Sequence, residues 1–424
     1  MRQRPFRPFY GWLMLGGLSA TELVSWGVLI YAFSVLIVPM RAELGWSLAE
    51  LNAAYATGVF ISGLLAIPVG RVLQVHGARG VMTAGTVATV VMLLLWSAVD
   101  SVPVFYAVFL IGGFAMATTL YEPAFAVTAA WFDRLRPRAV LILTVFGGLA
   151  SVMFVPLTAV LVDTFGWRQS LVVLAGIAAL IGFPVHGMLL RRRPADLGLH
   201  PDGARVPRPP QPHHVAGSSR VALRSKSFRW MTLCLVMSTA AKFAVSVVLV
   251  AFLTDRGYSL STAALAAGSV GLFQVAGRLI VIALRGRMSQ HLITALLFFG
   301  QGVAIALLLF VTGTDSTATV TVVVFVVLFG LGFGLEALVR GTLVAEYYGP
   351  ANYPSINGVL GAFVVAARAA GPLLAGVAGT GFGGFQSVFV TAAALCCLSA
   401  WTLVLAQRAR RAEVTALADG RPEP

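Results

Sequence analysis

The sequence has little charge, few acidic residues and almost no cysteine or lysine. Only 11% of its 424 residues are Asp, Glu, Lys or Arg, whereas 58% are hydrophobic. A water-soluble globule of this length cannot bury so much apolar surface, because its outer layer needs polar side chains. The composition therefore excludes an ordinary soluble domain and predicts that the solvent of this chain is lipid.

The three cysteines, Cys234, Cys396 and Cys397, lie inside apolar runs and have neither the spacing of metal ligands nor that of a disulfide framework. The sequence also lacks a Walker-type phosphate loop, a metal-ligand cluster and a nucleophile motif. We therefore expect no metal, no cofactor and no enzymatic activity. The same absences argue against a pump driven by ATP.

Twelve long apolar runs fill the chain. They are roughly 20–28 residues long, the length that a helix needs to cross a bilayer, and they lack the alternation of barrel strands. A helix satisfies its own backbone polar groups in lipid. The predicted spans are Tyr10–Pro39, Leu51–Leu73, Val81–Val99, Pro103–Phe132, Ala139–Val162, Gln169–Leu190, Phe228–Leu253, Thr262–Leu284, Leu292–Val311, Val320–Leu343, Asn352–Gly379 and Ser387–Ala406. The sequence therefore predicts an all-α membrane protein of twelve transmembrane helices in two six-helix bundles.

The formal net charge of +14 is placed unevenly along the chain. Most Lys and Arg residues lie at the two termini and in the even-numbered loops, whereas the odd-numbered loops carry only Arg41, Arg168 and Arg256. This alternation is the positive-inside pattern. It predicts a multi-pass protein of the cell (inner) membrane with both termini in the cytoplasm, and it favours contact with anionic lipid over binding to nucleic acid.

The stretch 191–227 is rich in proline and arginine and cannot form a core. We interpret it as a cytoplasmic linker between an N-terminal six-helix bundle over 1–190 and a C-terminal six-helix bundle over 228–407. Residues 408–424 then form a cytoplasmic tail.

An internal repeat relates the two predicted bundles. Gly45-Trp46-Ser47-Leu48 precedes the second helix, and Gly257-Tyr258-Ser259-Leu260 precedes the eighth. At nearly the same offset, Gln169-Ser170 begins the sixth helix and Gln386-Ser387 begins the twelfth. The repeat indicates that the two halves share a fold, a known transporter plan in which the substrate binds near the midplane.

Several short motifs resemble those of the major facilitator superfamily. They are Phe9-Tyr10-Gly11-Trp12, Gly45-Trp46-Ser47, Trp131-Phe132-Asp133-Arg134 and Gly166-Trp167-Arg168. The chain is most similar to the monocarboxylate and oxalate/formate branch. One departure is Gln74, which stands where the family has an acidic residue in the loop after the second helix. The resemblance implies a transporter that works by alternating access.

Five charged residues lie deep inside the predicted helices: Glu22, Glu122, Lys242, Arg278 and Arg368. A charge at the centre of a membrane helix costs about 2.5–3.5 kcal/mol on insertion scales, so such residues persist where they face a polar cavity or pair with each other. Both acids belong to the N-terminal half and all three cations to the C-terminal half. We therefore expect a central cavity between the halves with one acidic wall and one cationic wall.

The cations suggest that the substrate is a small organic anion. Arginine holds a carboxylate through two parallel charge-assisted hydrogen bonds, so we predict that Arg278 and Arg368, helped by Lys242, bind a mono- or dicarboxylate. Gln274 and Asn357 join this predicted site because helical spacing places them on the faces of Arg278 and Arg368. The family resemblance adds support, since basic residues on helices eight and eleven have this role in the relatives.

Glu22 and Glu122 are the candidates for carrying a coupling proton. The alternative is that either acid pairs permanently with a cation and locks the halves together. Glu336 and Arg340, four residues apart near the end of the tenth predicted helix, are interpreted as a structural ion pair.

The sequence thus predicts a secondary active transporter of a small organic anion, coupled to protons or working by exchange, and we expect a monomer. Two alternatives stay open. One is a multidrug or lipophile exporter of the same fold, which Glu22 and Glu122 would suit. The other is a membrane sensor that kept the fold and lost transport.

Overall fold

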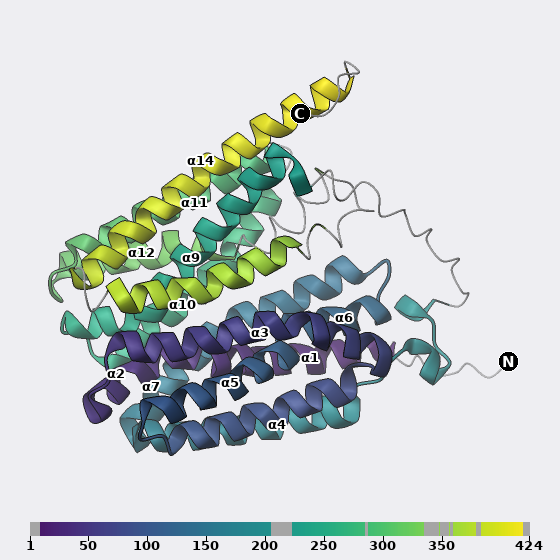
Figure 1. Ribbon diagram of the computed structural model, residues 1–424, viewed down its shortest axis with the longest axis horizontal. Helices are drawn as coiled ribbons and strands as arrows, with labels where there is room; N and C mark the ends of the chain where they lie inside the picture. The colour runs from purple at the N-terminus through teal and green to yellow at the C-terminus, as the bar shows by residue number, and fades with distance from the viewer. Residues whose placement is uncertain are drawn as a thin grey trace. The chain divides into compact units, whose positions relative to one another are not determined.

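The computed structural model is built of long helices (Figure 1). It describes residues 9–204, 223–284, 287–334, 347, 356, 359–378 and 383–418, and no β-strand occurs in these ranges. By its internal contacts the chain divides into two units. Unit 1 comprises Met1–Pro39 and Thr57–Pro210, and unit 2 comprises Met40–Ala56 and Gln211–Pro424.

The first span of the N-terminal half is interrupted by a short π-helix: α1 (Tyr10–Trp26) continues through η1 (Gly27–Tyr31) into α2 (Ala32–Leu44). Helix α1 packs against α7, and α4 packs against both α5 and α7. The remaining helices of this half are α3 (Leu48–His76), α4 (Ala78–Ser97), α5 (Val102–Thr119), α6 (Tyr121–Trp131), α7 (Arg136–Gly182), the π-helix η2 (Phe183–Leu189) and the 3₁₀ turns η3 (Pro194–Leu197) and η4 (Pro201–Gly203).

In unit 2, helix α14 packs along α9 and α11, and α10 packs against α12 (Figure 1). The helices are α9 (Lys226–Asp255), α10 (Leu260–Ala283), α11 (Gln290–Leu307) with the 3₁₀ turn η5 (Leu308–Phe310), α12 (Ser316–Phe333), an unlabelled helix over Val359–Ala378, and α14 (Gly384–Ala418). Helix α14 thus continues well beyond the predicted end of the last span at Ala406.

The fourth predicted span, Pro103–Phe132, corresponds to the single span Val102–Trp131, but the helix within it is interrupted. Helix α5 ends at Thr119, α6 begins at Tyr121, and Leu120 between them is extended, with φ −83° and ψ −166°. Pro123 explains the break, because proline has no N–H for the carbonyl of Thr119 and its ring crowds that carbonyl.

The structure contains eleven helices long and apolar enough to cross a membrane within its described residues, against twelve predicted. The fifth and sixth predicted helices account for this difference, because they form the single span Arg138–Leu189. The chain changes direction inside α7 at Gly166, where φ is 77° and ψ is 165°. Glycine is suited to this position because a side chain disfavours positive φ.

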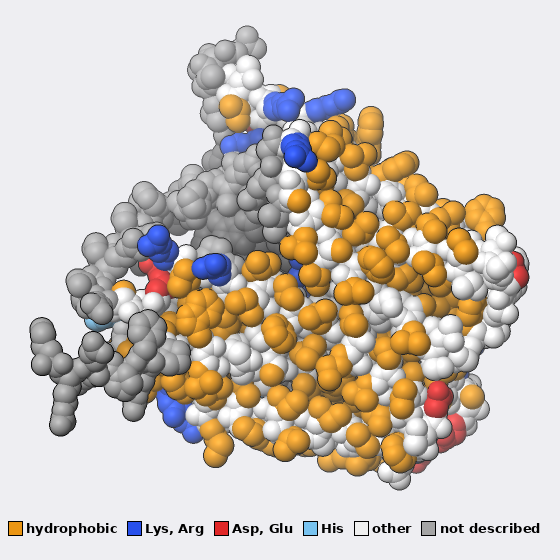
Figure 2. Space-filling model, turned by 180° about the vertical axis from the view of Figure 1, so that it is seen from behind, with side chains coloured by type: hydrophobic (Ala, Val, Ile, Leu, Met, Phe, Trp, Pro, Cys, Tyr) orange, Lys and Arg blue, Asp and Glu red, His pale blue; other side chains and the backbone are white. Residues whose placement is uncertain are grey.

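Large apolar side chains cover the outside of the helices. Figure 2 shows hydrophobic side chains over most of the visible described surface, with charged side chains near its margins. Leu180, Phe310 and Ile67 are 77%, 73% and 68% exposed. A soluble protein rarely exposes so much apolar surface, so this surface fits a lipid environment and a multi-pass membrane protein.

The sequence repeat corresponds to a repeat of local structure. Gly45 and Gly257 both have positive φ, at 70° and 96°. Ser47 Oγ then accepts a hydrogen bond from the backbone N–H of Glu50, and Ser259 Oγ accepts one from Thr262, each at 3.2 Å. Both halves therefore use the same corner, a glycine that reverses the chain followed by a serine that caps the next helix.

Part of the predicted linker is ordered against unit 1. The carboxylate of Asp202 accepts hydrogen bonds from the backbone N–H groups of Asp133, Arg134 and Leu135, at 3.1, 2.7 and 3.2 Å. These groups lie just before α7 begins at Arg136, where a negative charge complements the helix dipole. This contact joins the segment after η2 to the end of α6.

Candidate substrate-binding site

Two of the three predicted cations meet at the end of one helix in unit 2. Lys242 Nζ on α9 donates to the carbonyl oxygen of Phe333 at 3.4 Å, and Arg278 Nε on α10 donates to that of Gly334 at 3.2 Å. Phe333 is the last residue of α12, and Gly334 follows it. The carbonyls at a helix C-terminus have no partner inside the helix and carry partial negative charge, so this end of α12 holds both cations in place.

Two phenylalanine rings connect the third cation to this pair. The guanidinium carbon of Arg368, in the helix over Val359–Ala378, lies 5.0 Å from the centre of the Phe243 ring. That ring lies 6.2 Å from the Phe333 ring, over which Lys242 Nζ stands at 5.6 Å. The structure therefore brings Lys242, Arg278 and Arg368 together, each from a different helix, around Phe243 and Phe333. We call these five residues the cationic cluster.

The cluster is largely withdrawn from solvent. Lys242 is 1% exposed and Arg278 is 8% exposed, while Arg368 is half-buried. Gln274, one turn before Arg278, is 7% exposed, and its Oε1 makes no hydrogen bond with the described residues. A Cβ at Gly334 would lie 2.5 Å from Gln274 Cγ. Glycine at this position therefore lets α10 approach the end of α12 closely enough for Arg278 to reach its carbonyl.

Three further predicted residues lie outside the described part of the chain. They are Asn357, assigned to the anion site, and Glu336 and Arg340, assigned to a structural ion pair. Their predicted roles stay predictions.

The two predicted acids belong to unit 1 and have different surroundings. Glu22 on α1 is 0% exposed, and its Oε2 accepts a hydrogen bond from Trp26 Nε1 at 3.0 Å. Its other oxygen, Oε1, has no hydrogen-bond partner among the described residues. A buried carboxyl oxygen without a partner is costly, so Glu22 has a free acceptor that a proton or a donor group can satisfy.

Glu122 is exposed, in the first turn of α6, directly after the break at Leu120. Its neighbour Tyr121 packs on Trp26, with ring centres 4.8 Å apart, so the buried and the exposed acid are linked through two aromatic rings. The two carboxyl groups also interact electrostatically with each other. Sequence spacing alone missed the helix break, although Pro123 was its signal.

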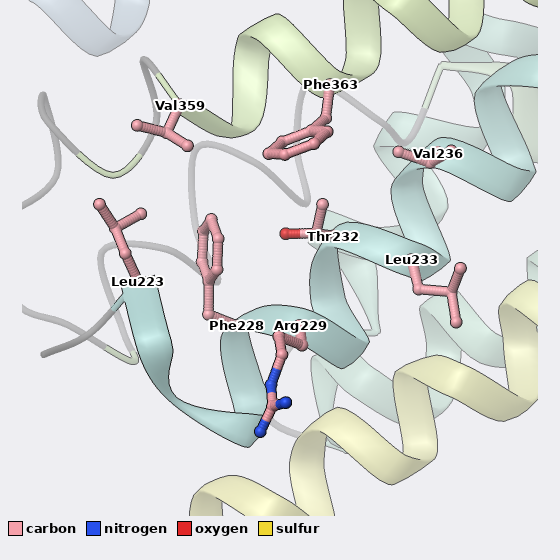
Figure 3. A pocket seen from close by; sticks show the side chains of 8 residues that line it. All are labelled: Leu223, Phe228, Arg229, Thr232, Leu233, Val236, Val359 and Phe363. Atoms are coloured by element: carbon pink, nitrogen blue, oxygen red, sulfur yellow. The ribbon is translucent and has the colours of Figure 1, made fainter. Parts of the chain in front are cut away.

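Unit 2 also contains an apolar groove of about 560 Å³ that is separate from the predicted anion site. Figure 3 shows Phe228, Thr232 and Phe363 around one space, with Arg229 at its edge. The other lining residues are Leu223, Leu233, Val236 and Val359. The groove holds none of the three clustered cations, and its lining suits an apolar group better than a carboxylate.

Comparison with known proteins identifies the family to which this chain belongs. The family model described as Major Facilitator Superfamily matches residues 19–338. The chain belongs to the Major Facilitator Superfamily. It is therefore a member of a transporter family, as the sequence motifs predicted.

Curated relatives of this superfamily member include monocarboxylate transporters. Monocarboxylate transporter 11 of Homo sapiens is 29% identical over 170 residues, which cover 40% of this chain and 36% of the relative. Monocarboxylate transporter 13 of Bos taurus is 26% identical over 275 residues, which cover 63% of this chain and 60% of the relative. The matches thus span about a third to three fifths of the relatives' length.

Solved structures of other transporters share the fold. A bacterial homolog to the human lysosomal transporter Spinster, in an inward-facing and unoccupied conformation, has a TM-score of 0.71 at 14% identity and covers 100% of both chains. The nucleoside transporter NupG has a TM-score of 0.69 at 17% identity, covering 93% of this chain and 98% of its own. These identities are low, so the likeness concerns the fold and not the substrate.

Proposed function

We propose that this transporter moves a small organic anion, a mono- or dicarboxylate, across the cell membrane by alternating access. The observation that carries the proposal is the cationic cluster, in which Lys242, Arg278 and Arg368 approach one another inside unit 2. A carboxylate placed there would accept charge-assisted hydrogen bonds from more than one cation in a site with little water. The printed names of the monocarboxylate relatives support the same substrate class.

The phenylalanine rings contribute to this binding mode. Phe243 and Phe333 hold Arg368 and Lys242 through cation–π contacts, which pre-organises the cations before the anion arrives. We therefore assign anion binding to the cations and orientation of the cations to the two rings and to Gln274.

Proton coupling is the second part of the proposal. Glu22 is buried with one free carboxyl oxygen, and exposed Glu122 is linked to it through the packed rings of Tyr121 and Trp26. We assign the entry of a proton to Glu122 and its storage to Glu22, with exchange of one anion for another as the mode that needs no proton. The excess of basic residues at the termini and in alternate loops supports cytoplasmic termini.

The test is uptake of labelled carboxylates by purified protein in proteoliposomes, with a panel of mono- and dicarboxylates and, in parallel, cationic dyes. We expect at least one carboxylate to accumulate and to be competed by others of its class. Extrusion of cationic dyes without carboxylate transport would overturn the proposal in favour of a lipophile exporter.

Arg368→Gln tests the half-buried member of the cluster. We expect substrate affinity to fall by about tenfold or more, because one charge-assisted contact contributes about 1.5–3 kcal/mol, while expression and melting temperature stay near those of the unmodified protein. Isothermal titration of the best substrate measures this effect. Unchanged affinity would remove Arg368 from the site.

A further inference from the structure

Unit 1 encloses a small polar cavity that the proposed transport mechanism does not use. It lies between α1, α4, α5, α7 and η2, and its volume of about 10 Å³ is room for about one water molecule. The polar side chains that line it are Thr21, Ser25, Thr86, Thr89, Thr119 and His186.

The hydroxyl hydrogens of four cavity threonines are donated within their own helices. Each threonine donates to a carbonyl oxygen in the preceding turn of its own helix, at 2.7–3.1 Å: Thr21 to Leu18, Thr86 to Met82, Thr89 to Gly85 and Thr119 to Ala115. A carbonyl oxygen can only accept, so the direction of these bonds is fixed. The threonine oxygens therefore face the cavity as acceptors.

His186 adds another acceptor. Its Nδ1 lies 2.8 Å from Thr86 Oγ1. Thr86 Oγ1 also lies 3.1 Å from the carbonyl oxygen of Met82, which can only accept, and with the Thr86 hydrogen on that bond Nδ1 is the donor to Thr86. An uncharged imidazole carries one hydrogen, so Nε2 is an acceptor. This tautomer is the one that the experiment below tests. His186 is 1% exposed, and its Nε2 has no hydrogen-bond partner among the described residues.

A glycine and a π-helix position His186 beside Thr86. His186 belongs to η2, and π-helical turns are frequent at functional sites. A Cβ at Gly182, one turn earlier, would lie 2.6 Å from Thr86 Cγ2. The bare backbone at Gly182 thus allows the end of α7 to approach α4 closely, and the same approach delivers Nδ1 to Thr86.

The occupant of such a cavity has to be a hydrogen-bond donor, small and uncharged. A cation would need a compensating charge, and the residues that line the cavity include no acidic side chain. We propose that the cavity is a binding site for one water molecule, which donates one hydrogen bond to His186 Nε2 and another to an oxygen on α1, either Thr21 Oγ1 or Ser25 Oγ.

This water would join η2 to the turn of α1 that contains Glu22, because Thr21 precedes Glu22 and Ser25 follows it by three residues. His186 is then a positioning residue that acts on α1 through the water and takes no part in moving the coupling proton. The site is independent of the cationic cluster, which lies in unit 2.

The experiment is nitrogen NMR of the full chain, labelled in its six histidines and reconstituted in lipid, together with a structure at a resolution that shows ordered water. We expect the His186 signal, assigned by its loss in His186→Gln, to report hydrogen on Nδ1 and a hydrogen-bonded acceptor at Nε2. We also expect density for one water within hydrogen-bonding distance of Nε2.

Thr21→Val and Ser25→Ala remove the two possible α1 partners, and at least one of them should shift the Nε2 signal toward that of a free acceptor. Thr164→Val is the matched control, because exposed Thr164 donates to the carbonyl of Val160 in the same way but lies outside the cavity. Hydrogen on Nε2, a cavity without density while other buried waters are visible, or equal shifts in the control and both α1 variants would overturn the proposal.

Discussion

The N-terminal and C-terminal halves of the chain make the same turn but hold buried charges of opposite sign. Gly45 and Gly257 begin equivalent corners, and a serine caps the helix that follows each of them. The buried charges differ, since Glu22 lies in unit 1 and Lys242 and Arg278 lie in unit 2. The residues that build the scaffold are repeated and the buried charges are not, which suggests that these charges serve transport rather than folding.

Among the substitutions that test this difference in charge, Arg278→Gln should have the largest effect. Arg278 is the most enclosed arginine of the cationic cluster, and its loss removes up to two charge-assisted hydrogen bonds to a bound carboxylate. We expect substrate affinity to fall by about 100-fold, which corresponds to about 3 kcal/mol. Concentration-dependent uptake in proteoliposomes measures it.

Arg256→Gln is the control for Arg278→Gln. Arg256 follows α9 in the same unit and also stands over a phenylalanine, with its guanidinium carbon 5.2 Å from the Phe252 ring. We expect this variant to keep its substrate affinity. If both variants lose affinity equally, the effect comes from general disturbance of unit 2 and the role of Arg278 is refuted.

Glu122→Gln tests the acidic side of the comparison. A pH difference of one unit supplies about 1.4 kcal/mol per proton, enough for up to about tenfold accumulation of a co-transported anion. We expect the variant to lose this accumulation while anion exchange continues at its normal rate, because exchange needs no net proton movement. Uptake with and without an imposed pH gradient measures both properties.

The control for Glu122→Gln is Asp163→Asn, which neutralises another exposed acid of unit 1, on α7. It should keep the full response to the pH gradient. An unmodified protein whose uptake ignores the gradient would end the proton proposal altogether.

The sequence was sufficient for those features that follow from hydrophobic length and local spacing. The spans, the repeat and the corners at Gly45 and Gly257 were all visible, because a transmembrane helix and a helix cap each need only nearby residues. The sequence also picked out Lys242, Arg278 and Arg368, since a charge inside an apolar run is conspicuous at any position.

Other features depend on contacts between distant segments and could not be derived from spacing. The predicted span Pro103–Phe132 placed Glu122 deep inside one helix, but the break at Leu120 leaves Glu122 exposed, whereas Thr118, one turn earlier, is buried. The pairing of His186 with Thr86 joins residues far apart in the chain. Convergence of Lys242 and Arg278 on the end of α12 likewise requires the packing of several helices.

Substitution of alanine for Gly45 and Gly257 tests whether the two corners are structurally equivalent. Neither Gly45 nor Gly257 has a neighbour that would clash with a Cβ, so the positive φ alone sets the cost. We expect Gly45→Ala and Gly257→Ala to destabilise the protein by a similar amount, about 1–2 kcal/mol each. Thermal unfolding in detergent compares them.

Gly16→Ala and Gly300→Ala are matched controls for the two corners, one in each half of the chain. Both glycines lie within helices without a close neighbour, so alanine should leave stability unchanged or raise it slightly. A large cost at one corner and none at the other would mean that the shared sequence motif does not create equivalent turns.

Asp202→Asn should have the smallest effect, a loss of stability confined to unit 1. Asp202 has φ 60°, a conformation that asparagine tolerates well, so this substitution keeps the backbone and removes the charge and one acceptor oxygen. The N–H of Arg134 then loses its bond to Oδ2, and we expect a loss of about 1 kcal/mol. Asp196→Asn is the comparison, because Asp196 accepts from Arg193 inside the same linker segment without contacting α6 or α7. If thermal unfolding shows the same shift for both, the linker is stabilised by its own turns and does not clamp the start of α7.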